Sequence, residues 1–380
     1  MLDSIKIAHL CPDEKFIDIA IDIFSHMENI KSDFYIATDN PVNFIKSKNI
    51  QIVSKTKETI KKLNEQSYDY IIIHSLYFFP QNLLLKLKAK LIAITWGYDI
   101  ESDCKDLIKM PINLELFKYY TRNAISVKPF SEKFHNFLMF LHCKIHNWQK
   151  AYYKLFKRLS YISTILPNEY DLIHKTYPDI KYFYFEYMDV KANIPFTPSM
   201  KINNNILVGH CTLPSNNHID ILNTLEKRKI KCNAYIPLAY PNGSFEQFNS
   251  EFYKNEVKNL CKNLQYVNPI FLETYIDKYE YFKIIDNCSC AIFGQLRQEA
   301  TGNINHMLYT GKKIFMYKDG LNYQYYSRHA KVFTIDDDLN NTIFDSVLET
   351  DIQYQNWKFI HDKENYSLFL NKLYNNIKNL

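Results

Sequence analysis

The chain has 380 residues, of which 47% are hydrophobic, and its formal net charge is +5 at pH 7. This length exceeds one ordinary domain and suits two, each with its own core. So small a charge gives no reason to expect a nucleic-acid partner. The sequence has no 18-residue apolar run of the kind a membrane-spanning helix needs, and its acidic start is unlike a signal peptide. We therefore expect a cytoplasmic protein.

The eight cysteines are scattered along the chain. The one close pair, Cys288 and Cys290, has no second pair to complete a zinc site. Free cysteines behave as small apolar side chains and are usually buried. We therefore expect buried free thiols and no bound metal.

Strand-like and helix-like segments alternate along the chain. In the first half, short apolar runs predict strands at 5–11, 33–38, 50–54, 68–76 and 90–95. Helical periodicity predicts helices at 15–27, 57–65 and 80–88. In the second half, strands are expected at 205–211, 232–237, 267–273, 288–293, 313–317 and 331–335. The helices expected there are 218–228, 251–263, 275–286, 303–309 and 363–377.

Strands separated by helices of about ten residues indicate βαβ units and parallel sheets. The sequence therefore predicts an α/β protein with two Rossmann-like, doubly wound domains that face a cleft. The boundary falls in the polar joint at 190–203, which contains two prolines. This gives an N-terminal domain at 1–195 and a C-terminal domain at 196–380, and the last helix can cross back to the first domain.

The stretch 131–159 differs from the rest of the chain. Apolar side chains recur there at steps of three and four residues, which indicates one face of a helix. Six lysine and arginine side chains accompany a single acid, Glu132. A basic amphipathic helix can lie on an anionic membrane surface. The alternative is an ordinary helix that packs on the N-terminal domain with a solvated basic face, and the sequence leaves both open.

Ligands of doubly wound sheets bind beyond the carboxyl ends of the strands. The loop 209–218 follows a predicted strand and opens a helix, which Ser215 or Asn216 can cap. The free N–H groups of the first turn and the helix dipole suit a diphosphate. A plain helix cap is the alternative. The donor-binding candidates of this loop are Gly209, His210, Ser215, Asn216, Asn217 and His218.

Two further loops carry candidate groups. The loop 294–303 offers the Arg297 guanidinium as a fork for phosphate and Glu299 as a partner for a sugar or ribose hydroxyl, although a surface turn would look the same. Its donor-binding candidates are Arg297, Gln298, Glu299, Gly302 and Asn303. The loop 237–241 offers Pro237 and Tyr240, whose ring can stack on a nucleobase or serve in the core or on the surface. The loop 209–218 does not read G-x-G-x-x-G, which disfavours a dinucleotide cofactor and an oxidoreductase.

The N-terminal half provides candidates for the acceptor side. Trp96 and Gly97 follow a predicted strand, and Gly97 permits a tight turn. A sugar hydroxyl becomes a competent nucleophile when a carboxylate or imidazole takes its proton. Asp99, Asp13 and His74 follow strands and are the candidate bases, while each can instead be a helix cap or a hydrogen-bonded structural group.

The order of these motifs and the residues in them resemble those of a bacterial family of transferases. That family moves 4-acetamido-4,6-dideoxygalactose (Fuc4NAc) from a dTDP donor to a lipid-linked disaccharide, the last sugar step of the enterobacterial common antigen repeat unit. The residues that carry the resemblance are 96–99, 187–189, 206–209, 215–219, 237–241, 297–298 with 302, and 336–339. The match spans most of the chain and is densest over 205–345.

The resemblance implies a GT-B fold, in which the C-terminal domain holds the nucleotide and the N-terminal domain faces the acceptor. It also implies that no divalent metal or other cofactor is needed, because a helix N-terminus and basic side chains neutralise the leaving diphosphate. By the same likeness, Asp99 faces the acceptor. The basic helix would lie on the inner membrane surface, near a polyprenyl-diphosphate-linked acceptor.

Two functions from different classes follow. The first is a glycosyltransferase that moves a Fuc4NAc-like deoxy or acetamido sugar from a dTDP- or UDP-activated donor to a lipid-linked or cell-surface glycan. The second is a non-catalytic protein that binds nucleotide sugars or glycans on the same scaffold, which fold alone does not exclude.

Overall fold

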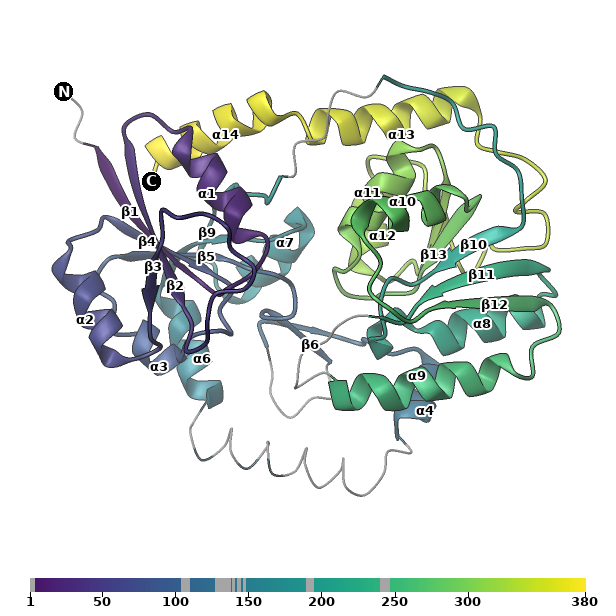
Figure 1. Cartoon of the computed structure of the whole chain (residues 1–380), viewed down its shortest axis with the longest axis horizontal. Helices are drawn as coiled ribbons and strands as arrows, with labels where there is room; N and C mark the ends of the chain where they lie inside the picture. The colour runs from purple at the N-terminus through teal and green to yellow at the C-terminus, as the bar shows by residue number, and fades with distance from the viewer. Residues whose placement is uncertain are drawn as a thin grey trace.

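The computed structural model describes residues 4–103, 110–126, 138, 141, 145, 148–188, 195–239 and 247–380. Two lobes lie side by side, each built around a parallel β-sheet with helices on both faces (Figure 1). The predicted α/β class with two Rossmann-like sheets is confirmed. Within the described residues, no helix is both long and apolar enough to cross a membrane. The six described cysteines are buried free thiols, as expected, and Cys104 and Cys143 lie outside the described residues.

The N-terminal sheet has the strand order β3-β2-β1-β4-β5-β8-β9. Its strands are β1 (Ile5–Cys11), β2 (Ile30–Ala37), β3 (Gln51–Val53), β4 (Tyr70–His74), β5 (Lys90–Ile94), β8 (Leu159–Ser163) and β9 (Lys181–Tyr182). All neighbours pair in parallel. Such a sheet is covered on both faces, so its central strands are mostly apolar, and every residue of β4 is buried, including His74. The strands after β3 are added on the other side of β1, starting with β4, so the switch point of this sheet lies between β1 and β4.

Helices cover both faces of the N-terminal sheet. They are α1 (Ile17–Ser25), α2 (Lys57–Glu65), α3 (Gln81–Leu84), α6 (Trp148–Arg158) and α7 (Pro167–Thr176). Ile60, Tyr152 and Ile173 belong to the core on one face. Ile17 and Ile23 belong to the core on the other.

The C-terminal sheet has the order β12-β11-β10-β13-β14-β15, again all parallel. Its strands are β10 (Asn205–Val208), β11 (Cys232–Pro237), β12 (Val267–Leu272), β13 (Cys290–Phe293), β14 (Lys313–Met316) and β15 (Phe333–Thr334). Its helices are α8 (His218–Lys227), α9 (Gln247–Cys261), α10 (Lys278–Asp286), α11 (Thr301–Tyr309), α12 (Leu321–Tyr326) and α13 (Thr350–Lys363), with the 3₁₀ turn η1 (Pro214–Asn216) before α8. The switch point lies between β10 and β13.

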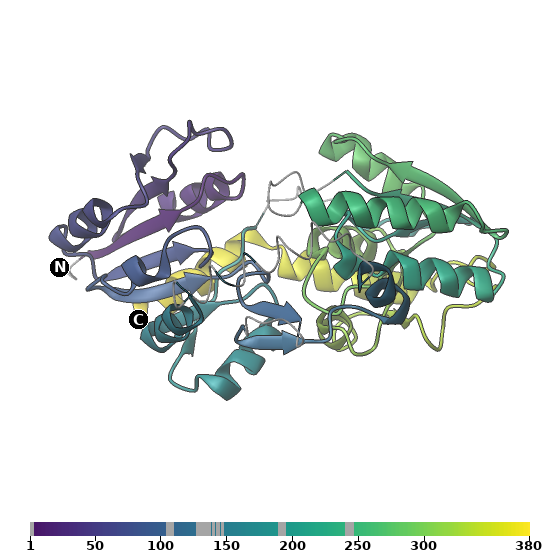
Figure 2. The same cartoon turned by 90° about the horizontal axis from the view of Figure 1, so that it is seen from below.

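Two segments cross between the lobes. The last helix, α14 (Tyr366–Lys378), packs Phe369, Leu373 and Ile377 against the N-terminal sheet, while α13 lies along the C-terminal lobe (Figures 1 and 2). In the other direction, α4 (Tyr119–Ser126) docks on α8. There the Asp220 carboxylate accepts hydrogen bonds from the backbone N–H groups of Tyr120 (2.8 Å) and Thr121 (2.7 Å). The small ribbon of β6 (Glu101–Asp103) and β7 (Ile112–Leu114) leads into that crossing.

Several expected elements differ in the structure. The helix expected at 80–88 is the single turn α3, which ends at Leu84, and β5 begins at Lys90. The last helix is preceded by α13, and Asn365 begins α14 by accepting a hydrogen bond from the Leu368 N–H at 3.0 Å. The helix expected to reach residue 159 ends at Arg158, because Leu159 starts β8 and pairs with β5. Most of 131–147 lies outside the described residues.

Candidate functional site

The loops after β10 and β13 meet at the switch point of the C-terminal sheet. The Gly209 N–H donates to the Ile292 carbonyl at 2.9 Å, and the Asn217 side-chain amide donates to the Gly294 carbonyl at 2.7 Å. Gly209 has φ +69°, and a Cβ there would overlap the His218 imidazole. Glycine is therefore required where the first loop leaves its strand. The two predicted donor-binding loops are thus held against one another.

The prediction that Ser215 or Asn216 caps α8 was wrong. Both residues lie in η1, and the residue before α8 is Asn217, with φ +52° and no capping side-chain hydrogen bond. The Ser215 hydroxyl donates to Glu299 Oε1 at 2.7 Å, and Asn216 Oδ1 accepts from the His210 N–H at 2.9 Å. The reason is Pro214, which begins a separate turn, so that these side chains link the two loops instead.

The N-terminus of α8 is covered by protein groups. The backbone N–H groups of His218 and Ile219 interact with the buried Tyr253 hydroxyl. The Lys118 N–H donates to Asn217 Oδ1 at 2.8 Å, which brings the α4 segment over the same helix end. A diphosphate at this helix end, which the sequence suggested, would have to displace these contacts.

The N-terminus of α11 is open instead. Its first flanking residue, Ala300, has φ +60° and no side-chain cap. Apart from its chain neighbours and the backbone of its own helix, no described atom lies within 4 Å of a Cβ placed on Gly302, which is exposed. The Asn303 amide donates to the Tyr281 hydroxyl at 3.0 Å. Uncapped N–H groups and the positive end of the helix dipole favour an anion here.

Arg297 lies just before this helix and forms an ion pair with Glu299 Oε1. Both side chains are largely buried, with exposed fractions of 14% and 8%. A buried guanidinium keeps its charge and presents several donors in one plane, which suits phosphate oxygens. Arg297, Glu299 and Gly302 are therefore grouped at one helix end, as the sequence predicted for the second loop.

The loop after β5 brings the N-terminal lobe to this point. Gly97 has φ +81°, and a Cβ there would lie 2.8 Å from Gln298 Oε1. Glu101 Oε1 accepts a hydrogen bond from the Gln298 N–H at 3.4 Å. The Trp96 indole donates to the Tyr187 hydroxyl at 3.2 Å. Gly97, assigned to the acceptor side, and Gln298, assigned to the donor side, therefore meet across the two lobes.

Two buried carboxyls at this junction were not among the residues predicted from the sequence. Burial raises the pKa of Glu101 to about 8, although the neighbouring Arg297 opposes the rise. Burial also raises the pKa of Glu169 well above its ordinary value, and Glu101 adds to the rise. Glu101 lies two residues beyond Asp99 in the same loop, which was a usable signal. Glu169 lies in the first turn of α7, and nothing in the local sequence sets it apart from a capping acid.

The three candidate bases are all held by hydrogen bonds. Asp99 is fully buried and accepts from the Trp96 N–H (2.8 Å) and the Leu76 N–H (2.9 Å). Burial raises its pKa to about 6. Asp13 accepts from the N–H groups of residues 43, 44 and 45 at 2.6, 3.1 and 3.3 Å, so its carboxylate fixes that loop.

His74 belongs to a buried chain of side chains. One ring nitrogen lies 3.0 Å from His9 Nδ1 and the other 2.6 Å from the Tyr187 hydroxyl. Burial lowers the pKa of His74 to about 3, so the imidazole is neutral near pH 7. The Tyr187 hydroxyl that His74 contacts also accepts the hydrogen bond from the Trp96 indole, so His74 helps to fix the position of that ring.

Within the part of the chain that the structure describes, one group of side chains could hold a metal ion. Ligand atoms of His210, Cys211 and Glu299 lie within 4.8 Å of one another. Burial opposes protonation of His210, but Cys211 and Glu299 outweigh it and raise the pKa of His210 to about 9. A metal would therefore have to displace a proton from His210 and would share Glu299 with the Arg297 guanidinium. The positive charges already present fit an anion better than a cation.

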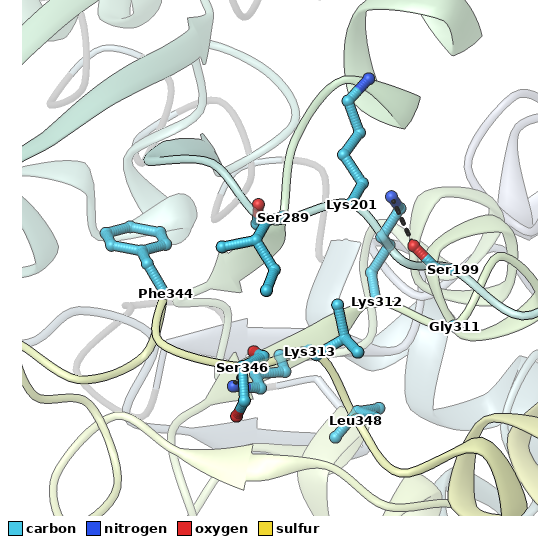
Figure 3. Close-up of a pocket in the computed structure, with 11 residues that line it drawn as sticks. Ser199, Lys201, Ser289, Gly311, Lys312, Lys313, Phe344, Ser346 and Leu348 are labelled. Atoms are coloured by element: carbon cyan, nitrogen blue, oxygen red, sulfur yellow. Dashed lines mark hydrogen bonds between the residues drawn. The ribbon is translucent and has the colours of Figure 1, made fainter.

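Pro237 lies at the carboxyl edge of the C-terminal sheet, beside the loop after β10, because the Thr212 hydroxyl donates to the Leu238 carbonyl at 3.3 Å. Pro237 ends β11, and Tyr240 lies outside the described residues. A surface pocket lies at the opposite end of the C-terminal strands, beside Ser289 and Lys313 (Figure 3). Two of its three lysines are engaged, because Lys312 Nζ donates to Ser199 Oγ (3.2 Å) and Lys313 Nζ to two backbone carbonyls. We therefore place the site at the switch point.

Comparison with solved structures identifies the architecture. No family model and no curated protein sequence matches the chain. The Anabaena protein HepE, in complex with UDP and glucose, superposes with a TM-score of 0.56 at 12% identity over 99% of this chain and 100% of its own. A UDP-forming trehalose-phosphate synthase from Burkholderia xenovorans gives 0.59 at 7% over 99% of both chains. Sucrose-phosphate synthase from Thermosynechococcus elongatus gives 0.53 at 9% over 99% and 98%. The chain therefore has the GT-B fold.

Proposed function

We propose that this chain is a nucleotide-sugar-dependent glycosyltransferase. The observation that carries the proposal is the open N-terminus of α11 beside the buried Arg297, at the point where the two lobes of a GT-B fold meet. A diphosphate bound there would be neutralised by fixed groups. Hydrogen-bond donors that are already oriented toward a developing charge usually contribute most of the rate enhancement in such catalysis.

The donor would lie with its diphosphate at α11 and Arg297. Glu299 would turn from its ion pair toward a sugar or ribose hydroxyl when the phosphate takes over Arg297. The similar structures include a UDP complex and a UDP-forming synthase, which supports a uridine nucleotide, while the Fuc4NAc-transferase resemblance supports dTDP. We propose a donor of one of these two kinds that carries a deoxy or acetamido sugar, used without a metal ion.

The acceptor would approach from the N-terminal lobe, past Trp96 and Gly97. Asp99 remains our candidate base, because burial brings its pKa to about 6 and a base with a pKa near the working pH is effective. Its two hydrogen bonds to backbone N–H groups would have to weaken as the acceptor binds.

A lipid-linked acceptor at the inner membrane surface has structural support. Leu138, Leu141 and Ile145, spaced as one helix face, have exposed fractions of 47%, 36% and 75%. Lys150 and Lys154 follow on α6. Exposed apolar side chains next to basic ones are typical of helices that lie on anionic membranes, so we favour this interpretation over a helix packed on the lobe.

The direct test is a transfer assay without added metal. Purified protein would be incubated with UDP- and dTDP-activated sugars and a polyprenyl-diphosphate-linked glycan, and the product detected by mass spectrometry. We expect a product that carries one added sugar, with equal yield in the presence of EDTA. Nucleotide binding without any product over a broad acceptor panel would instead support the non-catalytic binding protein. The hydrogen bonds that occupy Asp13, His74 and Asp99 give that alternative its basis.

A further inference from the structure

The pocket at the amino ends of β13 and β14 contains a buried lysine that has no ion pair (Figure 3). Lys312, which directly precedes β14, is 5% exposed. Its Nζ donates to the Ser199 hydroxyl at 3.2 Å, and this is its one side-chain hydrogen bond in the described part of the chain. Lysine is rarely buried unless an opposite charge accompanies it. A neutral hydroxyl leaves the charge of Lys312 in place, so an anion would stabilise this pocket.

The groups around this lysine do not supply the missing anion. The Asp286 carboxylate attracts the Lys312 ammonium but is held by His306 Nε2 at 2.7 Å. Lys201 lines the same pocket, and its charge adds to the lowering of the Lys312 pKa that burial causes. Lys313 Nζ bonds two backbone carbonyls, which are neutral. Among the residues that the structure describes, these three lysines therefore meet without a carboxylate paired to any of them.

The walls of the pocket are held in place by one buried side chain. Gln353 accepts a hydrogen bond from the Ser199 N–H at 2.7 Å and donates to the Leu348 carbonyl at 2.7 Å. It thereby fixes the segment before β10 and the loop before α13 on either side of the pocket. Gly311, with φ +71°, makes room for it, because a Cβ there would overlap the Gln353 amide. The arrangement is therefore a fixed feature of the fold.

The polar groups that point into this pocket are donors. An ammonium has three N–H donors, and Lys312 uses one of them on Ser199. The Ser199 hydroxyl accepts that bond, so its own proton remains available to an acceptor. Lys201 is exposed, and its long side chain can turn toward a bound group. Water would satisfy these donors but would not neutralise the charge, whereas phosphate oxygens do both.

We propose that this pocket is a second ligand site, which binds a phosphate group through Lys312, Ser199 and Lys201. The site lies at the opposite end of the C-terminal strands from the lobe junction, and it does not depend on the proposed transferase activity. Ser199 and Lys201 belong to the segment that joins the two lobes, whereas Lys312 belongs to the C-terminal lobe. A bound phosphate group would therefore fasten the joining segment to that lobe.

Isothermal titration with inorganic phosphate and with glucose 6-phosphate tests the site and identifies the source of the phosphate group. Both titrations would use the full chain at constant ionic strength. We expect saturable binding of at least one of the two compounds. Tighter binding of glucose 6-phosphate would identify a sugar phosphate as the ligand, and equal or tighter binding of inorganic phosphate would identify the free anion. No saturable binding of either compound would overturn the inference.

Variants place the phosphate in the pocket. Lys312→Met keeps a long side chain and removes its charge, so it should weaken phosphate binding by about tenfold or more. It should also unfold at a higher temperature than the wild type in phosphate-free buffer, because the buried unpaired charge is gone. Lys201→Gln should weaken binding less, and Lys358→Gln, at an exposed position of α13, is its matched control and should change nothing.

A further variant separates this site from the anion position proposed at α11. Arg297→Ala removes the cation at α11 and should retain the phosphate binding that depends on Lys312. Loss of binding in Arg297→Ala together with wild-type binding in Lys312→Met would place the phosphate at α11 and overturn the assignment. If Lys312→Met does not fold, Ser199→Ala provides the same comparison, because it removes the hydroxyl donor and leaves the lysine in place.

Discussion

Replacing Glu101 by glutamine tests the electrostatics of the lobe junction. Burial raises the pKa of this carboxyl from 4.5 to about 8, with Arg297 opposing the rise. The folded protein therefore binds this proton more tightly than the unfolded chain does. The stability that results is fully present below the unfolded-state pKa and is lost as the pH rises through about 8.

The magnitude follows from the size of the shift. As the pH rises from 4.5 to about 8, the titration of Glu101 lowers the free energy of unfolding by up to about 1.4 kcal/mol per pH unit. Glu101→Gln carries no titrating proton, so its stability relative to the wild type should increase with pH across this window. Urea unfolding from about pH 5.5 to about 8.5 would measure the difference.

A difference in stability that stays constant over this pH range would refute the reasoning. Glu169 is electrostatically coupled to Glu101 and also has a raised pKa. The same series on Glu169→Gln would therefore show how the titration is shared between the two carboxyls.

Three further predictions concern the same junction. Arg297→Ala should raise the donor KM and lower kcat while circular dichroism shows a folded protein. Arg328→Ala, at an exposed position, is the control and should leave both constants unchanged. Unaltered kinetics in Arg297→Ala would contradict the assignment of Arg297 to the diphosphate. Gly97→Ala should lower the free energy of unfolding by about 1–2 kcal/mol, because residue 97 has a left-handed backbone conformation. It should also impair sugar transfer, because the new Cβ would contact Gln298. A variant with wild-type stability and activity would contradict this prediction. If Asp99 is the base, kcat/KM should rise with pH through about 6 and Asp99→Asn should lose about 100-fold or more in rate, whereas a flat pH profile would exclude it.

The fold was accessible from the sequence because parallel strands in such sheets are short, mostly apolar runs. Strand β1 and helix α2 have the predicted bounds, and β11 does also. Strand β8 was missed because Leu159 continues the spacing of the helix before it, and only its pairing with β5 decides its conformation. Local periodicity does not contain that information.

The candidate site was predicted only in part. Arg297 and Gly302 lie in one loop, so sequence proximity brought them together. Glu101 and Glu169 come from distant segments of the N-terminal lobe, and Arg297 and Gln298 reach Glu101 from the C-terminal lobe, so only the folded chain brings these groups together. The error at Ser215 and Asn216 has a similar origin, because these side chains form hydrogen bonds with Glu299 and with the His210 N–H instead of capping α8.

The measurement that tests the central claim most directly is a thermal-shift panel of dTDP, UDP, GDP, CMP and NAD without added metal. A ligand present at about 100 times its Kd stabilises a fold by roughly 2.7 kcal/mol, which shifts the unfolding temperature visibly. We predict selective stabilisation by dTDP or UDP, and its loss in Arg297→Ala. Stabilisation by NAD alone, or by none of the five nucleotides, would contradict a nucleotide-sugar site at this junction.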